Sequence, residues 1–187
     1  MPINTHVTIN FAATCCHPKL AVPSFSLIRR HHHGKWATRH PRVPHTATGA
    51  YAFENVRDGE PFLTMDEGDQ HNVHTHWALH VPPALWSEFE GLIERWVSWT
   101  TGGETQSNAV KVTHPPPHRM RRYLLKGIAE GWAEIYKATA EPQGIVIGGR
   151  RSGVTANLGP SQRRALDRLL GVRRRVPARP TKKAVTA

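Results

Sequence analysis

Residues 73–81 read Val-His-Thr-His-Trp-Ala-Leu-His-Val, and Pro82-Pro83 follows them. Successive side chains of a β-strand point to opposite faces of its sheet. In this segment Trp77 and Leu79 therefore share one face with the other odd-numbered residues, while His74, His76 and His80 share the second face. The pattern predicts a strand with one apolar face and one face lined with imidazoles, and so a sheet that is packed on one side.

The rest of the chain supplies partners for this strand. Alternating or β-branched segments predict strands, and apolar residues at helical spacing between polar ones predict helices. The expected strands are 5–11, 49–56, 73–81, 109–113 and 144–148, with 61–72 as an extended hairpin arm; the expected helices are 24–30, 85–97, 119–127 and 161–170. This order predicts an α+β fold, an antiparallel sheet with helices packed on one face.

Charge is unevenly distributed along the 187 residues, whose formal net charge is +11. Residues 148–187 contain eleven Lys and Arg against the single acid Asp167, which favours an anionic partner, with nucleic acid as the first candidate. Residues 47–105 are acidic, which indicates either a site or a solvated helix face. We expect one domain over 1–160, with a Pro/His-rich insertion at about 14–48, and a basic helix with a disordered tail over 161–187.

Cysteine usage and hydropathy indicate a compartment. The only cysteines, Cys15 and Cys16, are adjacent and cannot form a disulfide framework, which favours a reducing, cytoplasmic setting. No apolar run approaches the length of a membrane span, so we expect no membrane partner.

Two histidines on the imidazole face are candidate metal ligands. His74 and His76 can offer two nitrogens to one divalent ion, and such an ion favours an oxygen ligand as well. Glu54 is the candidate for that oxygen, because it lies on the strand expected to pair with 73–81. His80 lies about 13 Å along the strand from His76 and is a weaker candidate. Zinc is the alternative ion, and a structural or surface role is the alternative for the histidines.

A candidate nucleophile lies about forty residues further along. In a helix a residue and its i+3 neighbour are adjacent, so Tyr123 and Lys126 present a phenol beside an ammonium. A phenol with a pKa near 10 is a poor nucleophile until a metal or base assists it and the electrophile is polarised. With a metal at His74 and His76, attack on DNA would give a phosphotyrosyl link and a free 3′-hydroxyl. The alternative is that Tyr123 packs on the helix and Lys126 is solvated.

Residues 148–159 read Gly-Gly-Arg-Arg-Ser-Gly-Val-Thr-Ala-Asn-Leu-Gly, a loop able to approach a phosphate backbone closely. Arg150 and Arg151 in this loop, with Arg163 and Arg164 in the basic helix, are candidate DNA contacts that read no sequence. The loop matches neither the Walker A pattern nor the dinucleotide fingerprint. Solvated arginines are the alternative.

The order of these motifs resembles the HUH endonucleases, specifically replication-initiator proteins of rolling-circle plasmids and filamentous phages. Residues 8–11 (Thr-Ile-Asn-Phe) look like the first motif, His74-Thr75-His76 like the second and Tyr123-Leu-Leu-Lys126 like the third. Thr75 stands where the family has a hydrophobic residue. The resemblance spans roughly residues 5–130. It implies an RRM-like, palm-like antiparallel sheet, Mg²⁺ or Mn²⁺, and a covalent tyrosyl-DNA intermediate.

From the motifs and the resemblance we expect an enzyme that nicks and rejoins single-stranded DNA at a replication origin. Its partners would be single-stranded DNA or an origin hairpin, together with host replication proteins. Two other hypotheses remain at this point. One is a non-catalytic nucleic-acid-binding protein with the same fold, and the other is a small protein with a structural zinc site.

Overall fold

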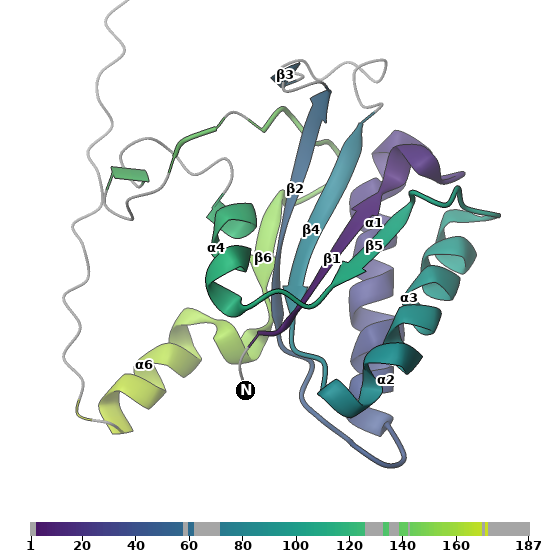
Figure 1. Ribbon diagram of the computed structural model, residues 1–187. Coiled ribbons are helices and arrows are strands. Elements are labelled where there is room, and N and C mark those ends of the chain that lie inside the picture. Colours follow the sequence, from purple (N-terminus) through teal and green to yellow (C-terminus); the bar gives the residue numbers. More distant parts are fainter. Residues whose placement is uncertain are drawn as a thin grey trace, which may run out of the picture.

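The computed structural model describes residues 3–57, 60–61, 72–125, 133–134, 139–141, 143–169 and 171. An antiparallel sheet with helices on both sides forms the centre of the molecule (Figure 1). The strands are β1 (Thr5–Asn10), β2 (Gly49–Arg57), β3 (Glu60–Pro61), β4 (Val73–Leu79), β5 (Val110–Thr113) and β6 (Ser152–Val154). The helices are α1 (Ala21–Leu27), α2 (Gly34–Arg39), α3 (Trp86–Thr101), α4 (Pro117–Leu125) and α6 (Pro160–Leu169).

The histidine-rich strand β4 lies in the middle of the sheet. The strand order is β3-β2-β4-β1-β5, and β6 pairs with β2 as well. Every pairing is antiparallel, including β4 with β2 on one side and with β1 on the other. The predicted α+β class with an antiparallel sheet is therefore confirmed.

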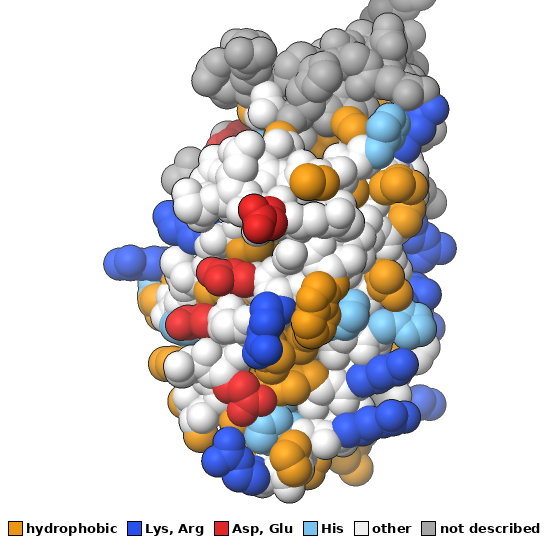
Figure 2. All heavy atoms as spheres, turned by 90° about the vertical axis from the view of Figure 1, so that its right-hand side faces the viewer, with side chains coloured by type: hydrophobic (Ala, Val, Ile, Leu, Met, Phe, Trp, Pro, Cys, Tyr) orange, Lys and Arg blue, Asp and Glu red, His pale blue; other side chains and the backbone are white. Residues whose placement is uncertain are grey.

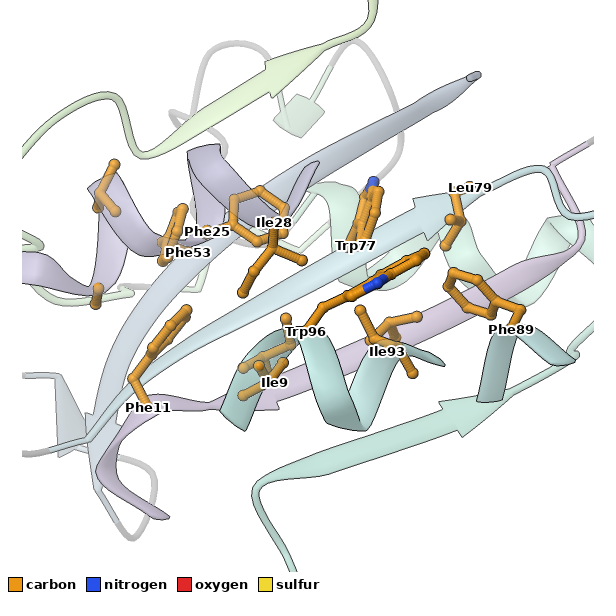
Figure 3. Packing of buried hydrophobic residues seen from close by; sticks show 14 of the residues in the cluster. Ile9, Phe11, Phe25, Ile28, Phe53, Trp77, Leu79, Phe89, Ile93 and Trp96 are labelled. Carbon is orange, nitrogen blue, oxygen red and sulfur yellow. The ribbon is translucent and has the colours of Figure 1, made fainter. Parts of the chain in front are cut away.

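The apolar face of the sheet packs against α1 and α3 and forms the hydrophobic core (Figure 3). Ile9, Phe53 and Trp77 come from three adjacent strands, and Phe89 and Ile93 come from α3; all five side chains are almost fully buried. Alternation along each strand places these residues on one face. The helix α3 ends at Gly102, whose φ of 84° is the left-handed conformation that glycine adopts easily at a helix C-terminus.

The segment 14–48 contributes more to the core than we expected. A single short helix at 24–30 was predicted, but α1, a π-helical stretch (Ile28–His33) and α2 form one continuous helical segment from residue 21 to residue 39. Its polar, histidine-rich composition is typical of a loop, yet Phe25, Ile28 and Ala37 are buried. His33 is 1% exposed, and its ring packs beside Trp77 in the core. Because a histidine is normally counted as polar, its presence at a core position hides the helical spacing of the apolar residues.

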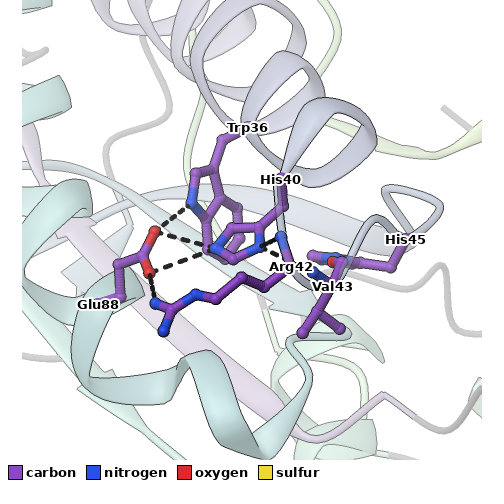
Figure 4. Close-up of polar contacts among 6 residues, drawn as sticks. All are labelled: Trp36, His40, Arg42, Val43, His45 and Glu88. Carbon is purple, nitrogen blue, oxygen red and sulfur yellow. Dashed lines mark hydrogen bonds and ion pairs between the residues drawn. The ribbon is translucent and has the colours of Figure 1, made fainter.

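A polar contact fastens the end of this helical segment to the start of α3 (Figure 4). The Glu88 carboxylate accepts a hydrogen bond from Trp36 Nε1 at 2.9 Å and lies 3.2 Å from His40 Nε2 and 3.8 Å from an Arg42 nitrogen. The hydrogen bonds from Trp36 and His40 lower the pKa of Glu88 below its usual value. This cluster joins two segments that are distant in sequence, since His40 and Glu88 are 48 residues apart.

Acidic side chains gather on one part of the face that these helices form. Figure 2 shows them over one half of this face with some Lys and Arg side chains among them, and a row of Lys and Arg side chains along the opposite edge. The glutamates of α3, Glu88, Glu90 and Glu94, are all exposed. At α3, the acidic middle of the chain is therefore a solvated helix face, one of the two interpretations that the sequence allowed.

Helices also lie on the other side of the sheet, which corrects the expectation that they pack on one face only. Figure 1 shows α4 on the side opposite α1, α2 and α3, and α4 lies against β2 and β4. Met120 of α4 is 2% exposed, so this helix has a buried side. The strand face with the imidazoles is therefore covered in part by the helix that contains Tyr123.

The strand predicted at 144–148 is absent from that range, and β6 forms at Ser152–Val154 instead. Residues near it still follow the edge of β2, because the Phe53 N–H donates to the Arg151 carbonyl at 2.7 Å and the Asn55 N–H donates to the Gln143 carbonyl at 2.8 Å. Glycines at 148 and 149, with φ of 87° and 153°, interrupt regular pairing. The hairpin arm at 61–72 and the tail lie largely outside the described residues.

Among the described residues, no helix combines the length and the apolar character that crossing a membrane requires.

Candidate functional site

The register of the sheet brings the predicted metal ligands onto one face. Glu54 of β2 lies directly opposite His74 of β4, and His76 lies opposite Ala52 one pleat further along. On the other side of β4, β1 places Asn10 opposite His74 and Thr8 opposite His76. Directly opposite residues in an antiparallel pair share a face. Glu54, His74 and His76 are therefore neighbours on the polar face, as the sequence predicted.

The His76 imidazole is held between two strands. Its Nε2 lies 2.8 Å from Glu54 Oε1, and its Nδ1 lies 3.3 Å from Thr8 Oγ1. When Nε2 carries the proton it donates to the carboxylate, and Nδ1 then accepts from the threonine hydroxyl. The two side chains are only 8% and 13% exposed. A buried contact of this kind is stronger than an ion pair on the surface, because water screens it less.

A third histidine, His6 of β1, belongs to this site and was missed by our sequence analysis. Its ring stacks on that of His76, with 5.3 Å between the centroids and 16° between the planes. Burial, followed by the nearby charges of His76 and Lys111, lowers the pKa of His6 from 6.5 to about 4. His6 therefore stays neutral at physiological pH. The alternation of polar residues at positions 6, 8 and 10 was the signal that could have identified it.

Lys111 of β5 is a cation that the structure places beside this face. It lies opposite Thr8, which itself lies opposite His76, so a row of residues crosses the sheet at this level. The side chain of Lys111 is exposed. A positive charge here favours approach of an anionic ligand to the histidines.

The donor set suits a divalent ion in chemistry and partly in spacing. Two imidazoles and a carboxylate are ordinary ligands of such ions. The 2.8 Å between His76 Nε2 and Glu54 Oε1 is close to the about 3 Å that separates adjacent ligands of an octahedral ion with bonds of about 2.1 Å. Among the described residues, however, no three His, Cys, Asp or Glu side chains converge as a metal-binding group. In this structure Glu54 and His76 form a two-ligand contact, and His74, although it lies opposite Glu54 on the same face, does not converge with them as a third ligand.

His80 lies apart from this pair. The strand β4 ends at Leu79, and the His80 ring lies 6.2 Å from that of His45, between centroids. The His80 N–H donates to the Thr48 carbonyl at 2.9 Å. Its weaker ranking as a ligand agrees with this position beyond the strand.

The predicted nucleophile is placed only by its backbone. Tyr123 belongs to α4, three residues after the buried Met120, and α4 lies against β2 and β4. Lys126 lies outside the described residues. The small residues Ala52 and Ala78 are buried on the polar face of these strands, which gives a helix room to approach closely. The structure thus brings the helix of Tyr123 to the face of the histidines.

The four predicted DNA-contacting arginines come from two parts of the chain, residues 150–151 and α6. Arg150 is exposed and lines a pocket beside α1, and Arg151 lies at the edge of β2 through its backbone. Arg164 is exposed on α6, and Arg163 is on the same helix.

Comparison of the chain with protein-family models, curated proteins and solved structures found no match.

Proposed function

We propose that this protein is a metal-dependent enzyme that nicks and rejoins single-stranded DNA through a covalent tyrosyl intermediate, and that it acts in the cytoplasm at a replication origin. The observation that carries the proposal is the polar face of β4. There Glu54, His74 and His76 lie side by side, and the helix of Tyr123 lies against the same strands. The net charge of +11 supports an anionic substrate.

The reaction is a transesterification at phosphorus. The Tyr123 oxygen forms a bond to the phosphorus, the bond from phosphorus to the 3′-oxygen breaks, and the phenolic proton ends on that 3′-oxygen. The 5′ end remains on the protein, and the reverse reaction rejoins the strands. Mg²⁺ or Mn²⁺ bound at this site would polarise the phosphate and lower the barrier to attack.

The chain's own residues prepare the site for this chemistry. Glu54 and Thr8 hold the His76 ring through both of its nitrogens in this structure. With a metal bound between Nε2 and Glu54, the Nδ1–H would donate to the Thr8 hydroxyl oxygen and keep the ring oriented. The stack of His6 on His76 limits rotation of the ring further. Lys126 is proposed to stabilise the developing negative charge beside Tyr123, and Lys111 to attract the DNA backbone.

The proposal is tested with labelled single-stranded oligonucleotides of randomised sequence, incubated with the protein and Mn²⁺ and separated in SDS. We expect a protein–DNA adduct that resists SDS and disappears in Tyr123→Phe. Tyr136→Phe is the matched control, because it removes another phenol from the same half of the chain, and it should retain the adduct.

Absence of any adduct, combined with tight and salt-sensitive DNA binding, would contradict the enzyme and favour the non-catalytic binding protein. An adduct that persists in Tyr123→Phe would contradict the assignment of the nucleophile.

A further inference from the structure

A pocket of about 280 Å³ lies on the side of the sheet opposite the histidines. It is bordered by α1, by the π-helical stretch that follows α1, and by residues 148–150. Tyr51 of β2 forms part of its wall, and Tyr51 alternates along that strand with Ala52, which lies opposite His76. The pocket is therefore separate from the candidate nicking site.

Three arginines line this pocket. Arg29, Arg30 and Arg150 are all in the lining, and none of the lining residues that the structure describes is acidic. Within the described part of the chain none of the three forms an ion pair. Three guanidinium groups around one small cavity repel each other, so an anion in the cavity would lower the free energy of the folded protein.

Arg29 provides a donor that no described residue accepts from. Its Nε is buried and has no hydrogen-bond partner among the described residues. The guanidinium lies over the Tyr51 ring, 5.1 Å from its centroid, which fixes its position. Burial lowers the pKa of Arg29, although a guanidinium remains charged at physiological pH. A buried N–H without a partner is costly, and an anionic oxygen would remove that cost.

The backbone at Gly148 and Gly149 closes the pocket against α1. A Cβ at position 148 would lie 2.4 Å from the Lys19 carbonyl oxygen, and one at position 149 would lie 2.7 Å from a Val22 methyl carbon. Glycine is required at both positions for this close approach. The approach is what brings Arg150 within the same cavity as Arg29 and Arg30.

We propose that this pocket binds a phosphate group. Planar guanidinium groups match phosphate oxygens with paired hydrogen bonds, and three of them suit a group that presents several oxygens at once. The volume is at the lower end of the range for small-molecule sites, which suits one phosphate with a sugar or base attached. The phosphate comes either from a strand of nucleic acid or from a free nucleotide or phosphate ion. The proposal does not depend on nicking.

The test compares two double variants that remove equal charge from the full chain. Arg30→Gln with Arg150→Gln removes two exposed arginines from the pocket, and Arg39→Gln with Arg95→Gln removes two exposed arginines that do not line it. The probes are inorganic phosphate and a fluorescent oligothymidylate, both titrated in EDTA so that no metal-dependent cleavage occurs.

For the probe that the pocket takes, we expect the pocket variant to bind at least about tenfold more weakly than wild type, and the control variant to change much less. If the source is nucleic acid, loss of two phosphate contacts should also reduce the slope of log affinity against log salt by about 1.4. Binding of inorganic phosphate by wild type identifies a free phosphate source, and binding of the oligonucleotide alone identifies a strand. Equal losses in the two double variants would overturn the proposal, as would failure of wild type to bind either probe.

Ser26→Asp provides a second measurement in which the protein is expected to become more stable. Ser26 lines the pocket, so an aspartate there would supply the missing anion. We expect a higher melting temperature together with loss of probe binding. A lower melting temperature with unchanged binding would contradict the placement of the anion.

Discussion

Replacing Glu54 with glutamine tests the His76–Glu54 contact and the proposed metal together. Glutamine keeps an oxygen that can accept from His76 Nε2 but removes the charge. Charge-assisted hydrogen bonds are roughly twice as strong as neutral ones. For a contact of 2.8 Å between side chains that are 8% and 13% exposed, we expect a loss of about 1 kcal/mol in the free energy of unfolding.

A change of this size is measurable as a shift in the melting temperature. For a chain of this length 1 kcal/mol corresponds to about 2–4 °C. Free Mn²⁺ at ten times its dissociation constant raises the free energy of unfolding of wild type by about 1.4 kcal/mol, which raises the melting temperature by about 3–6 °C. We expect Glu54→Gln to begin lower in the absence of metal and to lose most of the rise with Mn²⁺, because a carboxylate ligand is gone.

Glu90→Gln is the matched control, because the chain holds a second pair of the same kind. Glu90 Oε1 lies 2.9 Å from His114 Nε2, but these side chains are 49% and 18% exposed and lie away from the histidine face. This variant should change stability by less than about 1 kcal/mol and keep the whole response to Mn²⁺. If Mn²⁺ raises the melting temperature of Glu54→Gln as much as that of wild type, Glu54 is not a ligand. Equal destabilisation of both variants would refute the estimate for the buried contact.

Two further predictions concern stability against pH and the contact between α2 and α3. Burial lowers the pKa of His33 from 6.5 to about 3, so the folded protein keeps this ring neutral while the unfolded chain takes up a proton below pH 6.5. Stability from this group is complete above pH 6.5 and is lost towards pH 3 by at most about 1.4 kcal/mol per pH unit; urea unfolding of His33→Phe should show a shallower fall, and an unchanged fall would contradict it. The lowered pKa of Glu88 means that its contacts stabilise the protein above the unfolded pKa near 4.5 and are lost as pH falls through the folded value. In urea at pH 7, Glu88→Gln should lower the free energy of unfolding by up to about 1 kcal/mol more than Glu94→Gln on the same helix does, and equal free energies of unfolding would show that the contacts contribute nothing.

The sequence predicted the sheet well because its strands carry a period of two. Alternation along 73–81 predicts the strand that lies at the centre of the sheet, and pairing with the strand at 49–56 predicts Glu54 beside the histidines, where the structure has it. The class of fold followed from the order of these elements. Register between strands was inferred only loosely, and the structure supplies it residue by residue.

Other parts could not be predicted, for physical reasons. His33 occupies a core position, and a polar residue at a buried position hides the helical periodicity of residues 21–39. His6 joins the site through β1, a strand distant in sequence from β4. Alternation places His6 on the polar face of its own strand, but only the pairing of β1 with β4 brings it beside His76. The pocket of Arg29, Arg30 and Arg150 requires two segments about 120 residues apart to meet. The pocket forms only because Gly148 adopts a positive φ, which the amino-acid sequence alone does not reveal.

The central claim, that Tyr123 becomes joined to DNA, is tested most directly by locating the attached nucleotide. After reaction with an oligonucleotide and Mn²⁺, nuclease and trypsin digestion should leave a nucleotide on a short peptide, because trypsin cleaves after Arg122 and after Lys126. The account predicts that mass spectrometry finds the nucleotide on residues 123–126. A nucleotide on residues 127–137, which contain Tyr136, or cleaved DNA with no modified peptide, would contradict it.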